Sequence, residues 1–147
     1  KEKIDGKFIP VFWSPVHFPD QTGTMGILCQ PKHPALADFP ANFHSDWQWW
    51  DLTKNSSTMI LNNAPEDFKP IVQVIDNFAR NHRLANTFEA TVEKGKLLVC
   101  SIDLERDLKN RPAARQFKNS ILKYMNSEKF NPEQSLTLKM LNNLFKN

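Results

Sequence analysis

The clearest hydrophobic patterns lie in the second half of the chain. Residues 87–93 alternate strictly, with Phe88, Ala90 and Val92 on one face, and this period of two predicts a half-buried strand. Lys94-Gly95 then predicts a tight turn, and the nearly continuous apolar run at 96–102 predicts the second strand of a β-hairpin. Because its run is less interrupted, we expect this second strand to be the more central one. The compact run at 71–75 predicts a further strand.

Two amphipathic helices are predicted at the end of the chain. Asn110 is placed to cap the first, with Pro112 in its first turn. Asn131 is placed to cap the second, with Pro132 at its first position and Gln134 set for a capping box. The apolar faces comprise Ala114, Phe117, Ile121, Tyr124 and Met125 in the first helix, and Leu136, Met140, Leu141, Leu144 and Phe145 in the second. A central strand followed by an amphipathic helix predicts a layered α/β domain.

Shorter patterns occupy the first half. Residues 8–13 predict an edge or irregular strand, because Pro10 interrupts the run. Residues 24–29 predict a buried strand, and residues 58–61 another short one. Residues 33–40 are bracketed by prolines, so they can hold at most a turn or two of helix.

Composition limits the classes of function. The 147 residues suit one domain, and 40% hydrophobic with 11% aromatic residues is a globular mixture. The net charge of +3 is small and its Lys and Arg residues are scattered, which argues against nucleic acid as a partner. No apolar run approaches the roughly 18–20 residues that span a membrane. Because the chain starts at Lys1 without an initiator Met, we expect residues 1–147 to be one accessory domain cut from a larger protein.

Candidate catalytic and metal-binding patterns are sparse. Cys29 and Cys100 lie in apolar, strand-like runs, which predicts buried free thiols and leaves a disulfide as the alternative. Two cysteines and four dispersed histidines give no zinc spacing, so we expect no metal and no cofactor. Neither cysteine sits on a glycine-flanked elbow, and there is no Gly-x-Ser-x-Gly motif. No spacing specifies the carboxylate pair of a glycosidase, so no catalytic residue is predicted.

The most unusual segment is HSDWQWWD at 44–51, which holds three of the four tryptophans. If it is extended, Trp47 and Trp49 point one way and Trp50 the other. Two interpretations stay open. The rings could stack on sugar faces, with Asp46 hydrogen-bonding hydroxyls, or they could anchor a long loop to the core or to a neighbouring domain. Exposure of the three rings in one plane would favour sugar binding, and burial would favour anchoring.

A second candidate cluster follows a predicted strand. Asp76 and Asp103 each come directly after an apolar run, and ligands gather at the carboxyl ends of strands in open α/β sheets. Asp76, Asn77 and Arg80 therefore form a candidate ligand or partner site. The alternative is that these Asp and Asn side chains only form the turn.

Most of the chain resembles a known family. The runs that carry the resemblance are FIPVFWSPVHF, GTMGILCQPKHPALADFP, HSDWQWWDL, PIVQVIDNFARNHRLANTFEATVEKGKLLVCSIDL and RPAARQFKNSILKYM. Together they are similar to the C-terminal region of large family 2 glycoside hydrolases, the β-galactosidase-like enzymes common in gut Bacteroidetes.

The stretch 71–125 also resembles the closing half of a class I glutamine-amidotransferase-like domain. The similar features are the hairpin turn at Gly95-Lys96, the strand end at Asp103-Leu104 and the helix start at Pro112-Ala113-Ala114-Arg115. This resemblance implies a partial or mixed flavodoxin-like sheet. The cysteine elbow and the paired His-Glu of an amidotransferase are not visible, so glutaminase activity is not implied.

The family 2 resemblance implies a non-catalytic accessory domain of a periplasmic or extracellular glycoside hydrolase. Such a domain would pack against the catalytic barrel, shape its cleft or support oligomerisation. The family's catalytic carboxylates lie in the barrel, so no catalytic residue transfers to this chain. The expected partners are the other domains of the parent enzyme, and carbohydrate if the alternative of a binding module on Trp47–Trp50 holds. Neither nucleic acid nor membrane insertion is expected.

Overall fold

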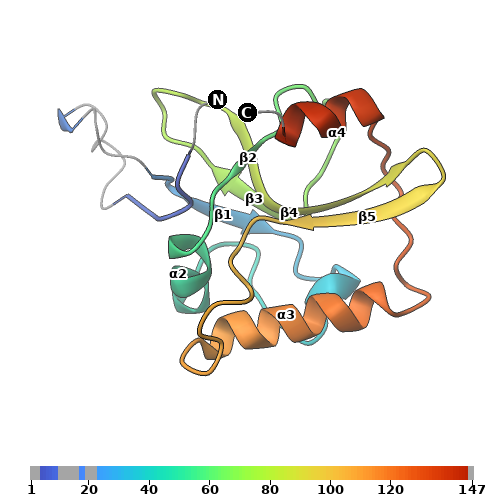
Figure 1. The fold of residues 1–147 in the computed structure, drawn as a ribbon. Helices are drawn as coiled ribbons and strands as arrows, with labels where there is room; N and C mark the ends of the chain where they lie inside the picture. Colours follow the sequence, from blue (N-terminus) through green and yellow to red (C-terminus); the bar gives the residue numbers. More distant parts are fainter. Residues whose placement is uncertain (1–3, 10–16, 19–22, 146–147) are drawn as a thin grey trace.

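A computed structural model describes residues 4–9, 17–18 and 23–145 of the chain (Figure 1). It has the mixed α/β class expected from the sequence, built on an open antiparallel sheet. The elements in chain order are β1 (Gly26–Cys29), the short 3-10 helix η1 (Pro34–Leu36), α2 (Trp47–Lys54), β2 (Met59–Ile60), β3 (Val72–Ile75), β4 (Arg83–Val92), β5 (Gly95–Cys100), α3 (Pro112–Met125) and α4 (Leu138–Phe145).

Strand β4 is the centre of the sheet. One of its edges pairs with β3, and β3 pairs in turn with β1. The other edge pairs with β2 near the start of β4 and with β5 near its end. All of these pairings are antiparallel, so a flavodoxin-like arrangement of parallel strands is not confirmed.

The predicted order of the hairpin strands is wrong. Of the described strands, β5 pairs with β4 alone and lies at the edge, whereas β4 has neighbours on both sides. The apolar run of β5 has another cause. Leu98 and Cys100 pack into the core on one face of the sheet, and Val99 packs into the core on the other. An apolar run indicates that both faces of a strand are buried. It does not indicate that both of its edges are paired with other strands.

A β-bulge interrupts the pairing of β4 with β3. Val72 pairs with Thr87 and Gln73 with Ala85, which leaves Asn86 as an extra residue. Strand β4 begins at Arg83, before the predicted start, and Thr87 is fully buried although its alternation placed it on a polar face. The alternation of buried and half-buried residues in β4 therefore starts only after Thr87. Before that position both faces of the strand are covered, because helices lie on both sides of the sheet.

Figure 1 shows the sheet between two helical layers, with η1, α2 and α3 on one side and α4 on the other. The core on the α3 side includes Ile27, Trp49, Val74, Leu84 and Phe117. The core on the α4 side includes Leu61, Phe68, Ala85, Phe88 and Leu136. The layered arrangement predicted from the strand and helix patterns is thus present.

Helix α3 has the predicted apolar face but not the predicted cap. Ala114, Phe117, Ile121 and Tyr124 are buried, whereas Met125 is exposed. The N-cap position is Arg111, and the Asn110 side chain instead donates to the Asp107 carboxylate at 3.0 Å. Ser120 fastens the helix to the η1 segment by donating to the Ala35 carbonyl at 2.7 Å and accepting from the Asp38 N–H.

The last helix starts later than its capping pattern predicts. Residues 134–136 extend along β4, where the Thr91 N–H donates to the Gln134 carbonyl and the Leu136 N–H donates to the Thr91 carbonyl. Helix α4 begins only at Leu138, and the Thr137 hydroxyl accepts from the Met140 N–H. The prediction from Asn131, Pro132 and Gln134 is wrong because the backbone groups of Gln134 and Leu136 bond to Thr91 on β4 instead.

The other short elements lie close to their predicted places. Strands β1, β2 and β3 fall within the runs 24–29, 58–61 and 71–75, and η1 lies between the two prolines. Residues 10–13 of the strand predicted at 8–13 lie outside the described residues. The hairpin turn is formed by Glu93 and Lys94, with Glu93 in the left-handed region at φ 54°, and Gly95 already pairs with Val92.

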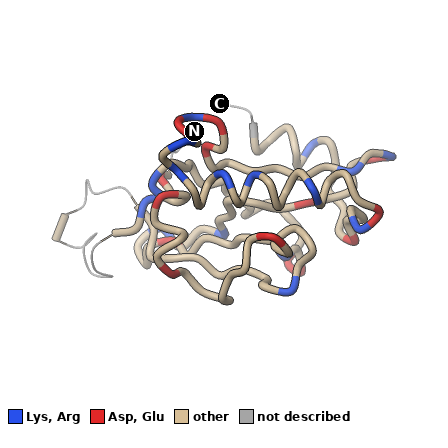
Figure 2. The backbone as a smooth tube through the Cα atoms, turned by 90° about the horizontal axis from the view of Figure 1, so that it is seen from below, with Lys and Arg blue, Asp and Glu red and all other residues tan. Residues whose placement is uncertain are grey.

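None of the helices in the described part of the chain is long and apolar enough to cross a membrane. Figure 2 shows basic and acidic positions interspersed along the chain, as the scattered charges of the sequence suggest.

Removal of the Phe117 ring should destabilise the domain strongly. The ring is fully buried, with centroids 5.1 Å from Phe39 and 5.7 Å from Trp49. We expect Phe117→Ala to lower the free energy of unfolding by about 3–5 kcal/mol, measured by urea denaturation. Leu122→Ala, at an exposed position of the same helix, is the control and should change it by less than about 0.5 kcal/mol. Equal losses in both variants would contradict this packing.

Candidate functional site

The tryptophan segment is helical, not extended. Asp46 is the N-cap of α2, and its Oδ1 accepts a hydrogen bond from the Gln48 N–H at 3.2 Å. Residues three apart share a helix face, so Trp47 and Trp50 lie together and Trp49 points elsewhere. The arrangement expected for an extended segment, with Trp47 and Trp49 on one face, therefore does not apply.

Trp49 anchors α2 to the rest of the domain. Its side chain is fully buried, and its ring meets Phe39 and Phe117 edge-to-face at centroid distances of 5.2 and 5.7 Å. The anchoring interpretation is confirmed for this ring. The indole Nε1 is buried without a hydrogen-bond partner among the described residues, and the ring contacts with Phe39 and Phe117 are the interactions that the structure shows for this side chain.

Trp47 and Trp50 form an exposed aromatic surface on the outside of α2. Trp47 is 88% exposed and Trp50 50% exposed. Their centroids are 6.5 Å apart and their planes are inclined by 57°, so the rings do not lie in one plane. The Phe8 ring extends this surface, with its centroid 6.4 Å from that of Trp50. We call Trp47, Trp50 and Phe8 the aromatic surface.

A hollow of about 440 Å³ lies beside Trp47. Its polar lining includes Asn42, Asp46 and Gln48. Asp46 Oδ2 accepts from the Asn42 amide at 3.5 Å, and the Gln48 amide donates to the Pro40 carbonyl at 2.9 Å. An exposed indole beside carboxylate and amide groups can stack on one sugar ring and hydrogen-bond its hydroxyls.

The Asp76 cluster builds the turn between β3 and β4. Asp76 is buried, and its carboxylate accepts from the Arg80 guanidinium at 2.7 Å and from the His82 N–H at 3.0 Å. Asn77 Oδ1 accepts from the N–H groups of Ala79 and Arg80, both at 3.0 Å. Neither Asp76 nor Asn77 lines the hollow beside Trp47. These bonds support the turn interpretation of the cluster.

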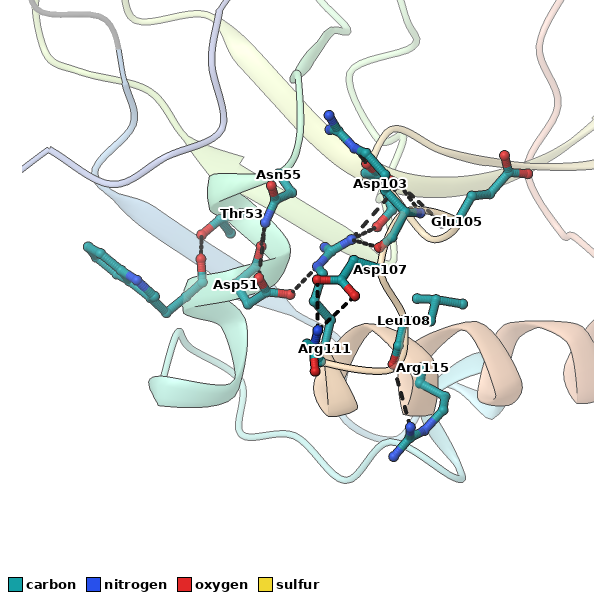
Figure 3. A network of polar contacts seen from close by, with 12 residues as sticks. Asp51, Thr53, Asn55, Asp103, Glu105, Asp107, Leu108, Arg111 and Arg115 are labelled. Carbon is teal, nitrogen blue, oxygen red and sulfur yellow. Dashed lines mark hydrogen bonds and ion pairs between the residues drawn. The ribbon is translucent and has the colours of Figure 1, made fainter.

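Arg111 links three elements through a polar network that the sequence did not suggest (Figure 3). Its guanidinium is almost fully buried; Nε donates to Asp51 on α2 at 2.7 Å, and Nη1 donates to the Asp103 carbonyl at 2.8 Å. The network therefore ties α2 to the loop after β5 and to the start of α3. Only the contact with Asp51, sixty positions away, lies beyond the reach of local sequence pattern.

Asp103 closes its own turn within this network. Its carboxylate accepts from the N–H groups of Glu105 and Arg106, both at 3.0 Å, and from the Arg106 side chain at 2.7 Å. These hydrogen bonds hold the pKa of Asp103 well below its usual range. The carboxylate borders an open polar hollow of about 430 Å³, together with Ser57 and Ser101.

Both cysteines are free thiols, as predicted; Cys29 is buried and Cys100 is half-buried. The Cys29 thiol donates to the Asn42 carbonyl at 2.6 Å, and burial, with Asp46 nearby, raises the pKa of Cys29 to about 11. Burial also raises the pKa of Cys100. Thiols of this kind stay protonated at neutral pH and are poor nucleophiles.

No three His, Cys, Asp or Glu side chains in the described ranges gather in a way that could hold a metal ion.

The structure brings together a third group, His33, Glu89 and Tyr124, that sequence reasoning missed. The Tyr124 hydroxyl donates to Glu89 Oε2 at 2.7 Å, and His33 Nε2 lies 3.5 Å from Glu89 Oε1. Burial and the Glu89 carboxylate raise the pKa of Tyr124 above its usual range. All three side chains line a partly enclosed cavity of about 240 Å³. His33 is the N-cap residue of η1, Glu89 lies on β4 and Tyr124 on α3, and no sequence spacing connects them.

The comparison with protein families gives a match over residues 1–146, to a family described as Domain of unknown function (DUF8487). The chain belongs to this family. No curated protein matches the chain. The DUF8487 description names no activity, so a function for this domain has to be argued from its own geometry.

The three tryptophans of α2 should respond differently to truncation. Trp49→Ala removes a fully buried ring and should lower the free energy of unfolding by about 3–5 kcal/mol. Trp47→Ala removes an exposed ring from the same helix and should change it by less than about 0.5 kcal/mol. Urea denaturation followed by circular dichroism measures both. A large loss for Trp47→Ala would mean that the aromatic surface supports the fold.

The lowered pKa of Asp103 predicts a specific acid sensitivity. Its carboxylate stabilises the fold above the unfolded-state pKa of about 3.9, and that contribution is lost as the pH falls through the lower folded-state pKa. We therefore expect the unfolding free energy to fall less steeply below about pH 4 in Asp103→Asn than in the unmodified domain. Asp67→Asn, at an exposed position, is the control. If the unfolding free energy falls equally with pH in all three proteins, the Asp103 carboxylate does not stabilise the fold in this way.

Proposed function

We propose that this DUF8487 domain is a non-catalytic accessory domain of a carbohydrate-degrading enzyme of the family 2 glycoside hydrolase type. The resemblance of its sequence runs to the C-terminal region of those enzymes supports this proposal. The observation that carries it is the exposure of Trp47 and Trp50 on a helix whose third tryptophan is fully buried. The domain docks against a neighbouring domain of its parent protein through this aromatic surface.

Core contacts fix the position of helix α2, which carries Trp47 and Trp50 of the aromatic surface. Trp49 packs into the core, and the Thr53 hydroxyl bonds to the Trp49 carbonyl at 2.9 Å within the helix. Asp51, which follows Trp50 directly, accepts a hydrogen bond from the Arg111 guanidinium at 2.7 Å. Rings presented on a fixed helix lose little conformational entropy on binding, and tryptophan is the residue most enriched among the strong contacts of protein interfaces.

A second candidate is carbohydrate binding at the hollow beside Trp47. The specific observation in its favour is the polar lining of Asn42, Asp46 and Gln48 next to an exposed indole. The 57° inclination between Trp47 and Trp50 favours docking, because two inclined rings do not form one flat platform for successive sugar units. A single ring at Trp47 could still stack on one sugar. In either case the resemblance supports a periplasmic or extracellular parent protein.

Docking predicts that the aromatic surface is covered in the parent protein. Hydroxyl-radical footprinting of this chain alone and of the full-length parent would compare the oxidation rates of individual side chains. We expect Trp47 and Trp50 to be protected severalfold in the parent. Leu122 and Leu138, exposed on α3 and α4, serve as internal references. Equal oxidation of the two tryptophans in both proteins would contradict docking at this surface.

A further inference from the structure

The cavity at the end of α3 is separate from the aromatic surface. It has a volume of about 240 Å³ and shares no lining residue with the hollow beside Trp47. Its walls come from stretches far apart in the chain, around Gln30, Lys69, Glu89, Tyr124 and Lys129. A water molecule occupies about 30 Å³, so the cavity has room for a small organic molecule.

Glu89 is the fixed acceptor in this cavity. Its side chain is only 12% exposed. The Tyr124 hydroxyl donates to Oε2 at 2.7 Å. His33 Nδ1 accepts the Ala35 N–H at 3.2 Å, and His33 Nε2 lies 3.5 Å from Glu89 Oε1. The Tyr124 hydroxyl is thus the hydrogen-bond donor that orients the carboxylate, and the His33 ring lies beside it.

The carboxylate keeps unused hydrogen-bonding capacity. Each oxygen of an ionised carboxylate can accept two hydrogen bonds, and the Tyr124 hydroxyl donates one to Glu89 Oε2. In the described part of the chain, no Lys or Arg nitrogen forms an ion pair with Glu89. A nearly buried carboxylate is costly unless donors satisfy it, so the cavity favours a ligand that brings further donors.

The other residues that line the cavity indicate which class of ligand would donate hydrogen bonds to Glu89. Lys69 and Lys129 balance Glu89 and Glu133, so the lining has no net charge and favours a neutral ligand. Gln30 donates its amide N–H to the Pro70 carbonyl at 3.1 Å, which leaves its amide oxygen as a second acceptor. Hydroxyl groups, which donate and accept, match such a mixture of carboxylate, amide and ammonium groups.

Aromatic side chains complete the site. The His33 and Tyr124 rings meet edge-to-face with centroids 5.4 Å apart, and the Phe130 ring meets Tyr124 edge-to-face at 5.3 Å. The cavity is smaller than the roughly 300–1,000 Å³ of sites for drug-sized ligands, which limits it to a single small ring.

We propose that this cavity binds one neutral monosaccharide, with Glu89 accepting hydrogen bonds from its hydroxyls and Tyr124 holding Glu89 in place. The choice of a sugar among neutral polyhydroxy compounds rests on the proposed function in carbohydrate degradation. The site itself rests on the geometry of the cavity.

The test is a titration of the 147-residue chain followed by ¹H–¹⁵N correlation spectra. The probes are galactose and glucose, with glucosamine as a cationic and glucuronate as an anionic analogue, each up to about 100 mM, where even millimolar affinity gives a saturable response. We expect a neutral hexose to shift the amides of Gln30, His33, Tyr124 and Asn131, and to bind more tightly than either charged analogue.

Three variants locate the site. Glu89→Gln should weaken the affinity at least about tenfold, because bonds to a charged acceptor are replaced by bonds to a neutral one. Tyr124→Phe keeps the ring and should also weaken binding, since Glu89 loses its orienting donor. Glu93→Gln, the same change at an exposed turn position on the adjoining hairpin, should bind as the unmodified chain does. The dispersion of each spectrum shows whether the variant is folded.

The remaining outcomes would overturn the inference. These are the absence of saturable shifts with both hexoses, tighter binding of a charged analogue, or binding that survives Glu89→Gln. Binding that Trp47→Ala abolishes and Glu89→Gln leaves intact would place the sugar in the hollow beside Trp47, as the second candidate function requires. Docking is judged separately by footprinting of the parent protein, so either proposal can fail without the other.

Discussion

The contact among Trp49, Phe39 and Phe117 determines how the outer surface of this domain is arranged. It joins α2, the segment after η1 and α3 over one face of the sheet, with every ring meeting its neighbours edge-to-face. Because Trp49 is directed inward, the geometry of the helix turns Trp47 and Trp50 outward. The aromatic surface is thus a direct consequence of a core contact, since nothing on the surface itself is needed to orient the two rings.

The sequence predicted elements well where one pattern dominated. The runs that became β1, β2 and β3 are short and apolar, and the buried stripe of α3 has helical spacing, so a local pattern is enough to indicate each element. The prediction failed where two local patterns competed. Residues 131–134 satisfy a helix cap in sequence, but Gln134 and Leu136 bond to Thr91 on β4 instead. The tryptophan segment could have been predicted as a helix, because Asp46 is a good N-cap residue before it.

The functional groups were harder to predict than the fold. Arg111 reaches Asp51 across sixty positions, and the cavity depends on His33, Glu89 and Tyr124, which belong to three elements. In the sequence, Glu89 was one of several polar residues alternating along a strand, and His33 was an isolated histidine. What makes them a group is the packing of α3 and η1 over the sheet. A single sequence carries no periodic signal for contacts of this kind.

The stretch 134–136 has a further consequence for the behaviour of the chain. Strand β3 pairs with β4 only as far as Thr87, so the backbone groups of Thr91 would be open on that edge if Gln134 and Leu136 did not bond to them. The Gln134 side chain adds two bonds to the backbone of Lys69, which fastens this cover just ahead of β3. An open strand edge is a template for pairing with another molecule. Residues 134–136 therefore cover this part of the β4 edge, and a chain shortened before Gln134 would leave the Thr91 backbone groups open to pairing with another molecule.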